Sequence, residues 1–367
     1  MDAGRIKEID VSPDLETVKA DTEGKYSKSS VLVIYTGGTI GMKEDPVDQT
    51  LKPFDFSQIL EEVPELGKFA GRLDSYTFSP LIDSSDVEPS LWQSLATLIE
   101  DKYDEYDGFV VLHGTDTMSF SASALSFMLD GLGKPVIFTG SQLPIGRPRT
   151  DGKENLISAV EIAAAKTPEG EAMVPEVCIY FDSRLMRGNR TTKVNSEHFS
   201  AFRSPNFPPL AEAGISIRYN RSLILSPSQA FKADTALDTR VSILKIHPGI
   251  TPQVVSNILL GPETRAVIIE TYGSGNAPSR EWFLDTVREA CRMGKILVNV
   301  TQCMQGSVNM DIYATGKKLK DAGVVSGYDS TTESMLGKLF HLMGTSSDND
   351  WVKSQISVNL KGEITCC

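Results

Sequence analysis

The feature that most constrains the fold of this chain is a regular alternation of short apolar segments with segments of helical periodicity. The apolar segments are VLVIY (31–35), FVVLH (109–113), PVIFTG (135–140) and EVCIYF (176–181). Helical periodicity marks about 56–63, 90–102, the residues after Met118, and about 153–165. Short strands that are apolar on both faces and are separated by helices indicate a parallel sheet with helices on both sides. We therefore predict an α/β protein.

Turn-forming polar residues follow nearly every predicted strand. They form the clusters TGGT (36–39), HGTDT (113–117), TGSQ (139–142) and DSR (182–184). In an open parallel sheet the ligand lies beyond the carboxyl ends of the strands. We therefore expect these clusters to converge on one site.

A second, smaller α/β domain is predicted after an irregular polar segment. Apolar strands resume at VSILKIH (241–247), AVIIETYG (266–273) and KILVNVTQ (295–302). A length of 367 residues also suits two domains of ordinary size. The predicted organisation is a flexible tail (1–29), an N-terminal α/β domain that carries the nucleophile and a lid (30–220), a linker (221–238) and a C-terminal α/β domain (239–365).

Composition excludes several classes of protein. The chain is 40% hydrophobic, which is enough to build a core, and its net charge of −12 has the wrong sign for binding nucleic acid. No segment approaches the ~18 to 20 apolar residues of a spanning helix, and the N-terminal residues lack an apolar signal segment. Five scattered cysteines favour a reducing compartment. We expect a cytoplasmic protein that needs no membrane and no nucleic acid.

Three short motifs contain groups that can perform nucleophilic chemistry. Thr39 follows Gly37 and Gly38 at the end of the first strand, Thr115 and Asp116 lie in HGTDTM, and Lys193 lies in RGNRTTKVN. Alone, each has a plainer explanation: a tight turn, a helix N-cap and a surface charge. Together they can act, because a hydroxyl nucleophile needs a base and a lysine beside an aspartate and a threonine can move its proton.

Other kinds of site have less support. Glycine backbone amides near Thr39 could stabilise an oxyanion, but TGGTIG lacks the spacing of a dinucleotide-binding loop and the lysine of a phosphate-binding loop. The four histidines lie far apart, without metal-ligand spacing, and are expected to be structural or exposed. We expect no metal and no cofactor.

Five motifs in the same order resemble the bacterial-type L-asparaginases, and among them the type I, cytosolic branch. They are TGGTIG (36–41), IDSSD (82–86), HGTDTM (113–118), TGSQLPIG (139–146) and RGNRTTKVNS (187–196), and the resemblance continues through YGSGNAP (272–278) and 299–316. It implies a two-domain α/β fold, a homodimer or homotetramer (a dimer of dimers) whose subunits complete each other's sites, and hydrolysis of L-asparagine to L-aspartate and ammonia without a cofactor.

The resemblance also implies roles for residues of the first domain. Thr39 resembles the nucleophile that forms a β-acyl-enzyme. Thr115, Asp116 and Lys193 resemble a second cluster, in which the lysine makes a threonine hydroxyl more basic and the aspartate also pairs with the substrate α-ammonium group. Gly38, Asp83 and Ser84 match substrate-binding positions.

Two residues of the second domain and one loop complete the implied site. Asn276 matches a residue that a neighbouring subunit contributes. The segment 40–56, a predicted lid, lacks the activating tyrosine of many relatives, and Tyr313 resembles a tyrosine that takes this role in some type I members.

A regulatory site is also implied, in altered form. Thr192 and Cys303 match positions of the pocket that binds a second asparagine in allosteric bacterial relatives. Glu270 stands where those relatives have an arginine, and its carboxylate would repel the α-carboxylate of the effector. We therefore expect a vestigial effector site without activation by asparagine.

Alternative functions are the amidase subunit of a tRNA-dependent amidotransferase and a non-catalytic asparagine-binding sensor. A lysophospholipase-like activity, which the resemblance attaches to some long relatives with ankyrin repeats, is less supported because the chain has no such repeats. Low glutaminase activity is expected, although one methylene changes binding by only ~1 to 3 kcal/mol.

Overall fold

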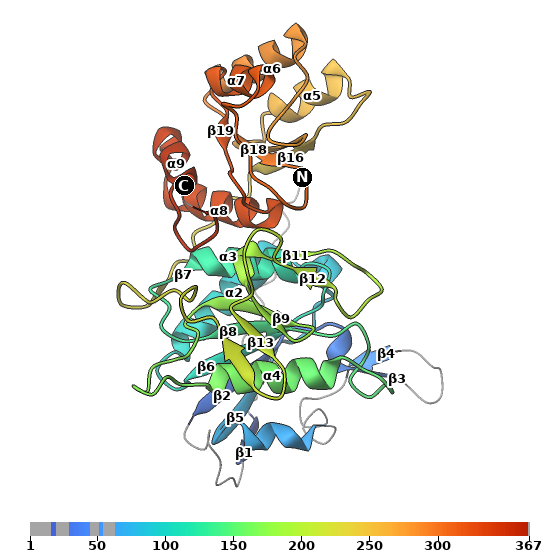
Figure 1. Ribbon diagram of the computed structural model, residues 1–367, viewed down its shortest axis with the longest axis vertical. Helices are drawn as coiled ribbons and strands as arrows, with labels where there is room; N and C mark the ends of the chain where they lie inside the picture. Colours follow the sequence, from blue (N-terminus) through green and yellow to red (C-terminus); the bar gives the residue numbers. More distant parts are fainter. Residues whose placement is uncertain (1–15, 20–28, 45–50, 54–62, 366–367) are drawn as a thin grey trace, which may run out of the picture.

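The computed structural model describes residues 16–19, 29–44, 51–53 and 63–365, and these form two α/β domains stacked along the long axis of the molecule (Figure 1). The N-terminal domain is built on a nine-stranded sheet. In spatial order its strands are β1 (Glu16–Lys19), β5 (Arg72–Thr77), β2 (Ser30–Tyr35), β6 (Gly108–Leu112), β8 (Val136–Thr139), β9 (Val177–Phe181), β10 (Arg184–Arg187), β13 (Ala211–Ala213) and β14 (Ile217–Tyr219).

The sheet is parallel in its centre and antiparallel at both sides. The four predicted strands β2, β6, β8 and β9 pair in parallel, together with β5, which was not predicted, whereas β1, β10, β13 and β14 pair antiparallel to their neighbours. The change of direction after β9 occurs at Asp182 and Ser183, whose φ angles are 49° and 63°. Two consecutive residues with positive φ form a turn that matches the twist of a hairpin. The cluster at 182–184 therefore reverses the chain.

Two regions of the sequence analysis lie at the limit of the described residues. Within the predicted tail, Glu16–Lys19 form β1, and the helix predicted near 56–63 lies outside the described residues except for its last position. After β2, the strand β3 (Met42–Glu44) pairs antiparallel with β4 (Leu51–Pro53). These two strands belong to the segment predicted as a lid.

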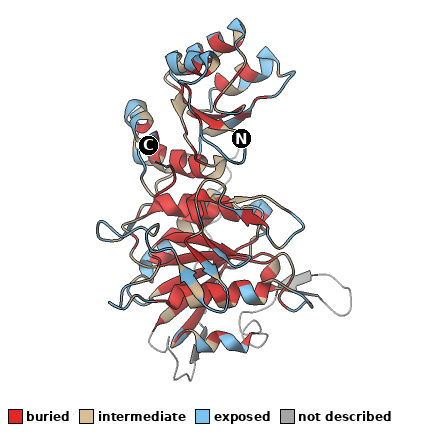
Figure 2. Cartoon of the chain, viewed as in Figure 1, coloured by how far each residue is buried: buried red, intermediate tan, exposed pale blue. Residues whose placement is uncertain are grey.

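Helices cover both faces of the large sheet. Along β2, Leu32 and Ile34 pack with α2 (Pro89–Asp101) and α3 (Met118–Met128), whereas Val31 and Val33 pack on the face covered by α4 (Gly152–Ala164). These four side chains are fully buried, and Figure 2 shows the centre of the large sheet mainly in the red of buried residues. Burial of each contributes about 1.5 to 3 kcal/mol relative to exposure. The helices predicted at 90–102 and 153–165 are confirmed to within one residue.

The C-terminal domain is a smaller parallel sheet, as predicted. Its strands are β16 (Val241–Lys245), β17 (Ala266–Thr271), β18 (Ile296–Thr301) and β19 (Val325–Ser326). One face packs against α5 (Pro252–Leu259), α6 (Glu281–Arg292) and α7 (Ala314–Asp321), and the other against α8 (Thr332–Thr345) and α9 (Asn349–Ile356).

Helix α8 also joins the two domains, and Figure 1 shows it lying directly above α3. A Cβ atom on Gly337 would lie 3.0 Å from the backbone nitrogen of Ala124 and 3.1 Å from its Cα. The two helices therefore touch at the level of the backbone, which a glycine permits. Nearby, Arg190 of the N-terminal domain forms a buried ion pair with Asp329 at 2.8 Å.

Short elements complete the described fold. Two further strand pairs are β7 (Leu129–Asp130) with β15 (Lys232–Ala233), and β11 (Thr192–Lys193) with β12 (Phe202–Arg203). Four 3₁₀ helices within the described residues are η1 (Thr39–Gly41), η2 (Pro64–Lys68), η3 (Ser84–Asp86) and η4 (Gly188–Arg190).

Candidate active site

The loops after β2, β5 and β6 meet at the carboxyl edge of the large sheet. Gly37 and Gly38 have φ angles of 136° and 95°. A Cβ on Gly37 would lie 2.1 Å from the carbonyl oxygen of Ile82, and one on Gly38 would lie 2.5 Å from the Cα of Gly114. No side chain fits at either position, so glycine is required for the loops to approach this closely. The half-buried Thr39 opens η1 at this junction.

Lys193 connects the loop after β6 with strand β11. Its Nζ donates to the Thr115 hydroxyl at 2.8 Å and to Asp116 Oδ1 at 2.6 Å. Charge-assisted bonds of this kind are strong and fix geometry. The Asp116 side chain remains 64% exposed, so its carboxylate can still meet a cationic group of a substrate. The predicted grouping of these three residues is present in the structure.

Gln142, in the loop after β8, belongs to the same cluster and was not singled out from the sequence. The Thr115 hydroxyl donates to its Oε1 at 3.3 Å, and its Nε2 donates to the backbone oxygen of His198 at 3.2 Å. Its backbone nitrogen donates to Asp151 Oδ2 at 3.0 Å. Burial raises the pKa of Asp151, although backbone donors oppose the shift. The sequence offers only one indication of this role: Gln142 follows β8, the strand that pairs with β6.

The loop after β5 presents its two predicted residues differently. Ser84 is buried, its backbone oxygen accepts from the Thr117 hydroxyl at 2.6 Å, and its Oγ would lie 2.4 Å from a Cβ on Gly114. Ser84 therefore lies at the loop junction. Asp83 is exposed and caps η3 by accepting from the Ser85 nitrogen and hydroxyl, and these bonds lower the pKa of Asp83.

His113 is fully buried beneath this junction. The indole N–H of Trp92 donates to Ser121 Oγ at 2.9 Å, which leaves the Ser121 hydroxyl to donate to His113 Nε2 at 2.9 Å. Nδ1 must then carry the hydrogen that it donates to the Gly114 oxygen at 2.7 Å. Burial lowers the pKa of His113 to about 4. The predicted structural role of this histidine is consistent with its position.

Asn276 and Tyr313 lie in the C-terminal domain. Asn276 Oδ1 accepts from the Thr315 hydroxyl at 2.6 Å, close to the exposed Tyr313 that precedes α7. Among the described residues, no hydrogen bond joins either side chain to Thr115 or Lys193. Within the described part of a single chain, Asn276 and Tyr313 therefore belong to the C-terminal domain and form no hydrogen bond with the Thr115–Lys193 cluster.

The three residues predicted for a vestigial effector site do come together. Thr192, Glu270 and Cys303 line one cavity of about 190 Å³, together with Lys193. Glu270 accepts from the Thr332 hydroxyl at 2.7 Å and lies 3.4 Å from Lys245.

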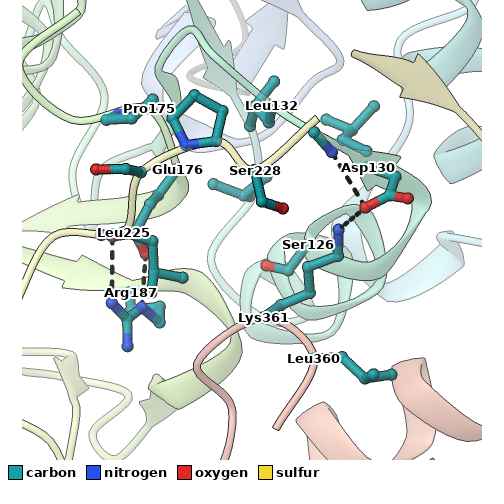
Figure 3. Close-up of a pocket in the computed structure, with 15 residues that line it drawn as sticks. Ser126, Asp130, Leu132, Pro175, Glu176, Arg187, Leu225, Ser228, Leu360 and Lys361 are labelled. Carbon is teal, nitrogen blue, oxygen red and sulfur yellow. Dashed lines mark hydrogen bonds and ion pairs between the residues drawn. The ribbon is translucent and has the colours of Figure 1, made fainter. Parts of the chain in front are cut away.

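A second cavity, of about 290 Å³, lies at the amino end of β9 (Figure 3). This is the end of the large sheet opposite to the candidate active site. Arg187 there pairs with Glu176 at 2.6 Å, and Lys361 pairs with Asp130. Because these charges are already paired and the cavity is remote from Lys193, it is not part of the candidate site.

Within residues 16–19, 29–44, 51–53 and 63–365, no group of three His, Cys, Asp or Glu side chains is arranged to hold a metal ion. None of the helices in these ranges combines the length and the hydropathy of a membrane-spanning segment.

Two family models and several known proteins match this chain. Residues 30–225 match the N-terminal domain of asparaginase, and 240–355 match the glutaminase/asparaginase C-terminal domain. The chain is 44% identical to L-asparaginase 1 of Escherichia coli strain K12, over 92% of this chain and 98% of that protein. It is 41% identical to the 60 kDa lysophospholipase of Mus musculus, over 91% of this chain and 62% of that protein. The crystal structure of L-asparaginase I from Vibrio cholerae superposes with a TM-score of 0.84 at 42% identity, covering 92% of this chain and 100% of that one.

The fold and the site define a two-domain α/β protein with a threonine, lysine and aspartate cluster at the carboxyl edge of its larger sheet. With both family models and these relatives in agreement, the chain belongs to the asparaginase family, in its type I branch.

Proposed function

We propose that this protein hydrolyses L-asparagine to L-aspartate and ammonia, with Thr39 as the nucleophile. The observation that carries the proposal is the contact of Lys193 with both Thr115 and Asp116, at the loop junction on which Thr39 lies. The E. coli and V. cholerae relatives named as L-asparaginases support the choice of substrate.

The proposed reaction has two steps. The Thr39 oxygen attacks the side-chain amide carbon of asparagine, and ammonia leaves with the hydroxyl proton, which produces a β-acyl-enzyme. Water then attacks the acyl carbon and returns a proton to Thr39, releasing aspartate. Thr115 and Lys193 accept and return the proton of the attacking group. Backbone N–H groups at Gly38 are suited to stabilise the oxyanion.

Substrate binding is assigned to the charged and polar groups around this junction. The exposed carboxylate of Asp116 is the partner for the α-ammonium group, and Gly38, Asp83 and Ser84 bind the α-carboxylate and the amine. Asn276 and Tyr313 reach a site from a neighbouring subunit, the tyrosine to assist activation of the nucleophile. The predicted lid is the segment 40–56, of which 45–50 and 54–56 lie outside the described residues, and its proposed role is to exclude water from bound substrate.

Assembly, location and specificity complete the proposal. We expect a homodimer or a homotetramer, a cytoplasmic location, domain boundaries at 30–220 and 239–365, and low activity on glutamine. Glutamine is longer by one methylene, so the site must reject it by displacing its amide from Thr39.

The test of the nucleophile compares Thr39→Ala with Thr39→Ser. The alanine variant lacks the attacking oxygen, so kcat for ammonia release from L-asparagine should fall by at least about 10³-fold, while binding of L-aspartate measured by calorimetry persists. The serine variant keeps the hydroxyl and should retain part of the activity.

Two results would argue against the proposal. Parent-like turnover by Thr39→Ala would exclude Thr39 as the nucleophile. Binding of asparagine without ammonia release by the parent would favour the sensor function instead.

A further inference from the structure

Lys193 is held on a short ribbon outside the nine-stranded sheet. Strand β11 consists of Thr192 and Lys193 alone, and it pairs antiparallel with β12, with Thr192 opposite Arg203 and Lys193 opposite Phe202. An isolated two-stranded ribbon is only marginally stable by its backbone bonds. Side-chain contacts therefore contribute to fixing where the lysine lies.

The two side chains of β11 leave the ribbon in opposite directions, as neighbours in a strand do. Lys193 extends to Thr115 and Asp116 in the N-terminal domain. Thr192 extends to the C-terminal domain, where its hydroxyl donates to Glu333 Oε1 at 2.5 Å. The residue next to the lysine is thus anchored on the other domain.

Glu333 is a well-fixed anchor. It lies in the first turn of α8, whose N-cap Thr331 accepts from the Ser334 nitrogen at 3.1 Å. Burial raises the pKa of Glu333, and the nearby Glu270 raises it further. The bond from Thr192 therefore ties strand β11 to the first turn of α8.

Helix α8 also helps to position Thr115, the partner of Lys193. Its Gly337 touches the backbone of Ala124 in α3, and α3 begins at Met118, two residues after Asp116. Thr115 is therefore positioned relative to α8 through α3, while Lys193 is positioned relative to α8 through Thr192. Helix α8 thus contacts both elements that carry the two partners of the Lys193–Thr115 hydrogen bond.

We propose that Glu333 and Thr192 are positioning residues for Lys193: together they hold the lysine within hydrogen-bonding reach of Thr115 and Asp116. This role rests on the function proposed above. Neither residue touches the reacting atoms; each acts through the position of the lysine.

The first test uses two matched threonine-to-valine variants. Thr192→Val removes the donor to Glu333, and Thr332→Val removes the equivalent donor to Glu270 (2.7 Å) in the same cavity but leaves β11 intact. We expect Thr192→Val to lower kcat for asparagine about tenfold or more, since small displacements of catalytic groups have large effects. Thr332→Val should stay within about twofold, and both variants should melt close to the parent.

Conservative variants separate positioning from general damage. Thr192→Ser keeps the hydroxyl and Glu333→Gln keeps an acceptor oxygen, so both should restore most of the activity lost in Thr192→Val and Glu333→Leu. Because one shared bond is removed, the double variant Thr192→Val/Glu333→Leu should be no slower than the slower single variant. Losses that multiply would overturn the proposal.

A second readout does not depend on asparagine turnover. The Lys193 side chain is 19% exposed and held by two partners, so its acetylation by acetic anhydride should be slow. Peptide mass spectrometry should show a severalfold faster reaction in Thr192→Val and no change in Thr332→Val. Equal acetylation in both variants would overturn the positioning role. A parent that releases no ammonia would instead contradict the function, and the acetylation rates would still decide the positioning.

Discussion

At the scale of single residues, His113 shows how a buried side chain supports a site without taking part in it. The ring fixes the Gly114 oxygen through Nδ1, and the serine and tryptophan bonds fix the ring. Gly114 in turn lies against Gly38, next to Thr39. The orientation of the loop therefore depends on a neutral imidazole.

This arrangement predicts a loss of stability in mild acid. The folded-state pKa of about 4 lies below the unfolded value of 6.5, so the unfolded chain binds the proton first as the pH falls. The free energy of unfolding should decrease by about 1.4 kcal/mol per pH unit from pH 6.5 down to the folded pKa, with no further contribution below it. Urea unfolding of the parent and of His113→Gln, at pH 7 and pH 5, measures this difference.

An exposed histidine provides the control for that experiment. His247→Gln should leave the free energy of unfolding at pH 7 close to that of the parent, because His247 lies in the C-terminal domain at the surface. The explanation is wrong if His113→Gln and the parent lose equal stability between the two pH values.

Functional residues that lie within a recognisable motif can be predicted from the sequence. Thr115, Asp116 and Lys193 were predicted together and do contact one another. Gln142 and Glu333 were missed, because their roles depend on partners 27 and 141 residues away. A glutamine after a strand and a glutamate at a helix start have common structural explanations, so neither attracts notice in the sequence.

At the scale of elements, the crossing of α3 and α8 controls both stability and the site. Gly337→Val would place side-chain atoms within contact distance of the Ala124 backbone, which cannot easily move. We expect the free energy of unfolding to fall by about 1 to 3 kcal/mol. Because α8 carries Glu333, asparagine turnover should also fall under conditions where the variant remains folded.

Gly146→Val is the matched control for this prediction. Gly146 is exposed, and a Cβ there meets nothing within 4 Å, so its effect on stability should be within about 0.5 kcal/mol. Thermal unfolding and initial rates measured on both variants check the prediction. A Gly337→Val variant as stable as Gly146→Val would show that the crossing tolerates a wider separation.

Element order could be read from the sequence more completely than strand direction. The alternation of apolar and helical segments predicts four of the five parallel strands of the large sheet and the principal helices that cover them. The fifth, β5, has the sequence RLDSYT without an apolar run, and it was not predicted. The antiparallel strands after β9 were not predicted, since Asp182 and Ser183 are not the asparagine–glycine pair that usually announces such a turn. The positive φ angles become visible only in three dimensions.

At the scale of the whole molecule, the cavity beside Lys193 bears on regulation. Glu270 already accepts from Thr332 and faces Lys245, and its charge opposes the α-carboxylate of a second asparagine. We predict a hyperbolic dependence of ammonia release on asparagine concentration, with a Hill coefficient close to one. Initial rates over a wide range of asparagine concentration give the Hill coefficient. The variant Glu270→Gln, which removes the negative charge, tests whether that charge is the cause. A sigmoidal curve in the parent would contradict the prediction.

The last part of the described chain closes the seam between the domains. Arg187 and Arg190 both donate to the Gly362 oxygen, and the fully buried Lys338 pairs with Glu363 at 2.6 Å. During synthesis these cations emerge from the ribosome before their partners do. Until then Arg187 has its partner Glu176, and Arg190 and Asp329 can already pair across the seam. The contacts of residues 361–365 are therefore among the last of the seam to become available as the chain is made.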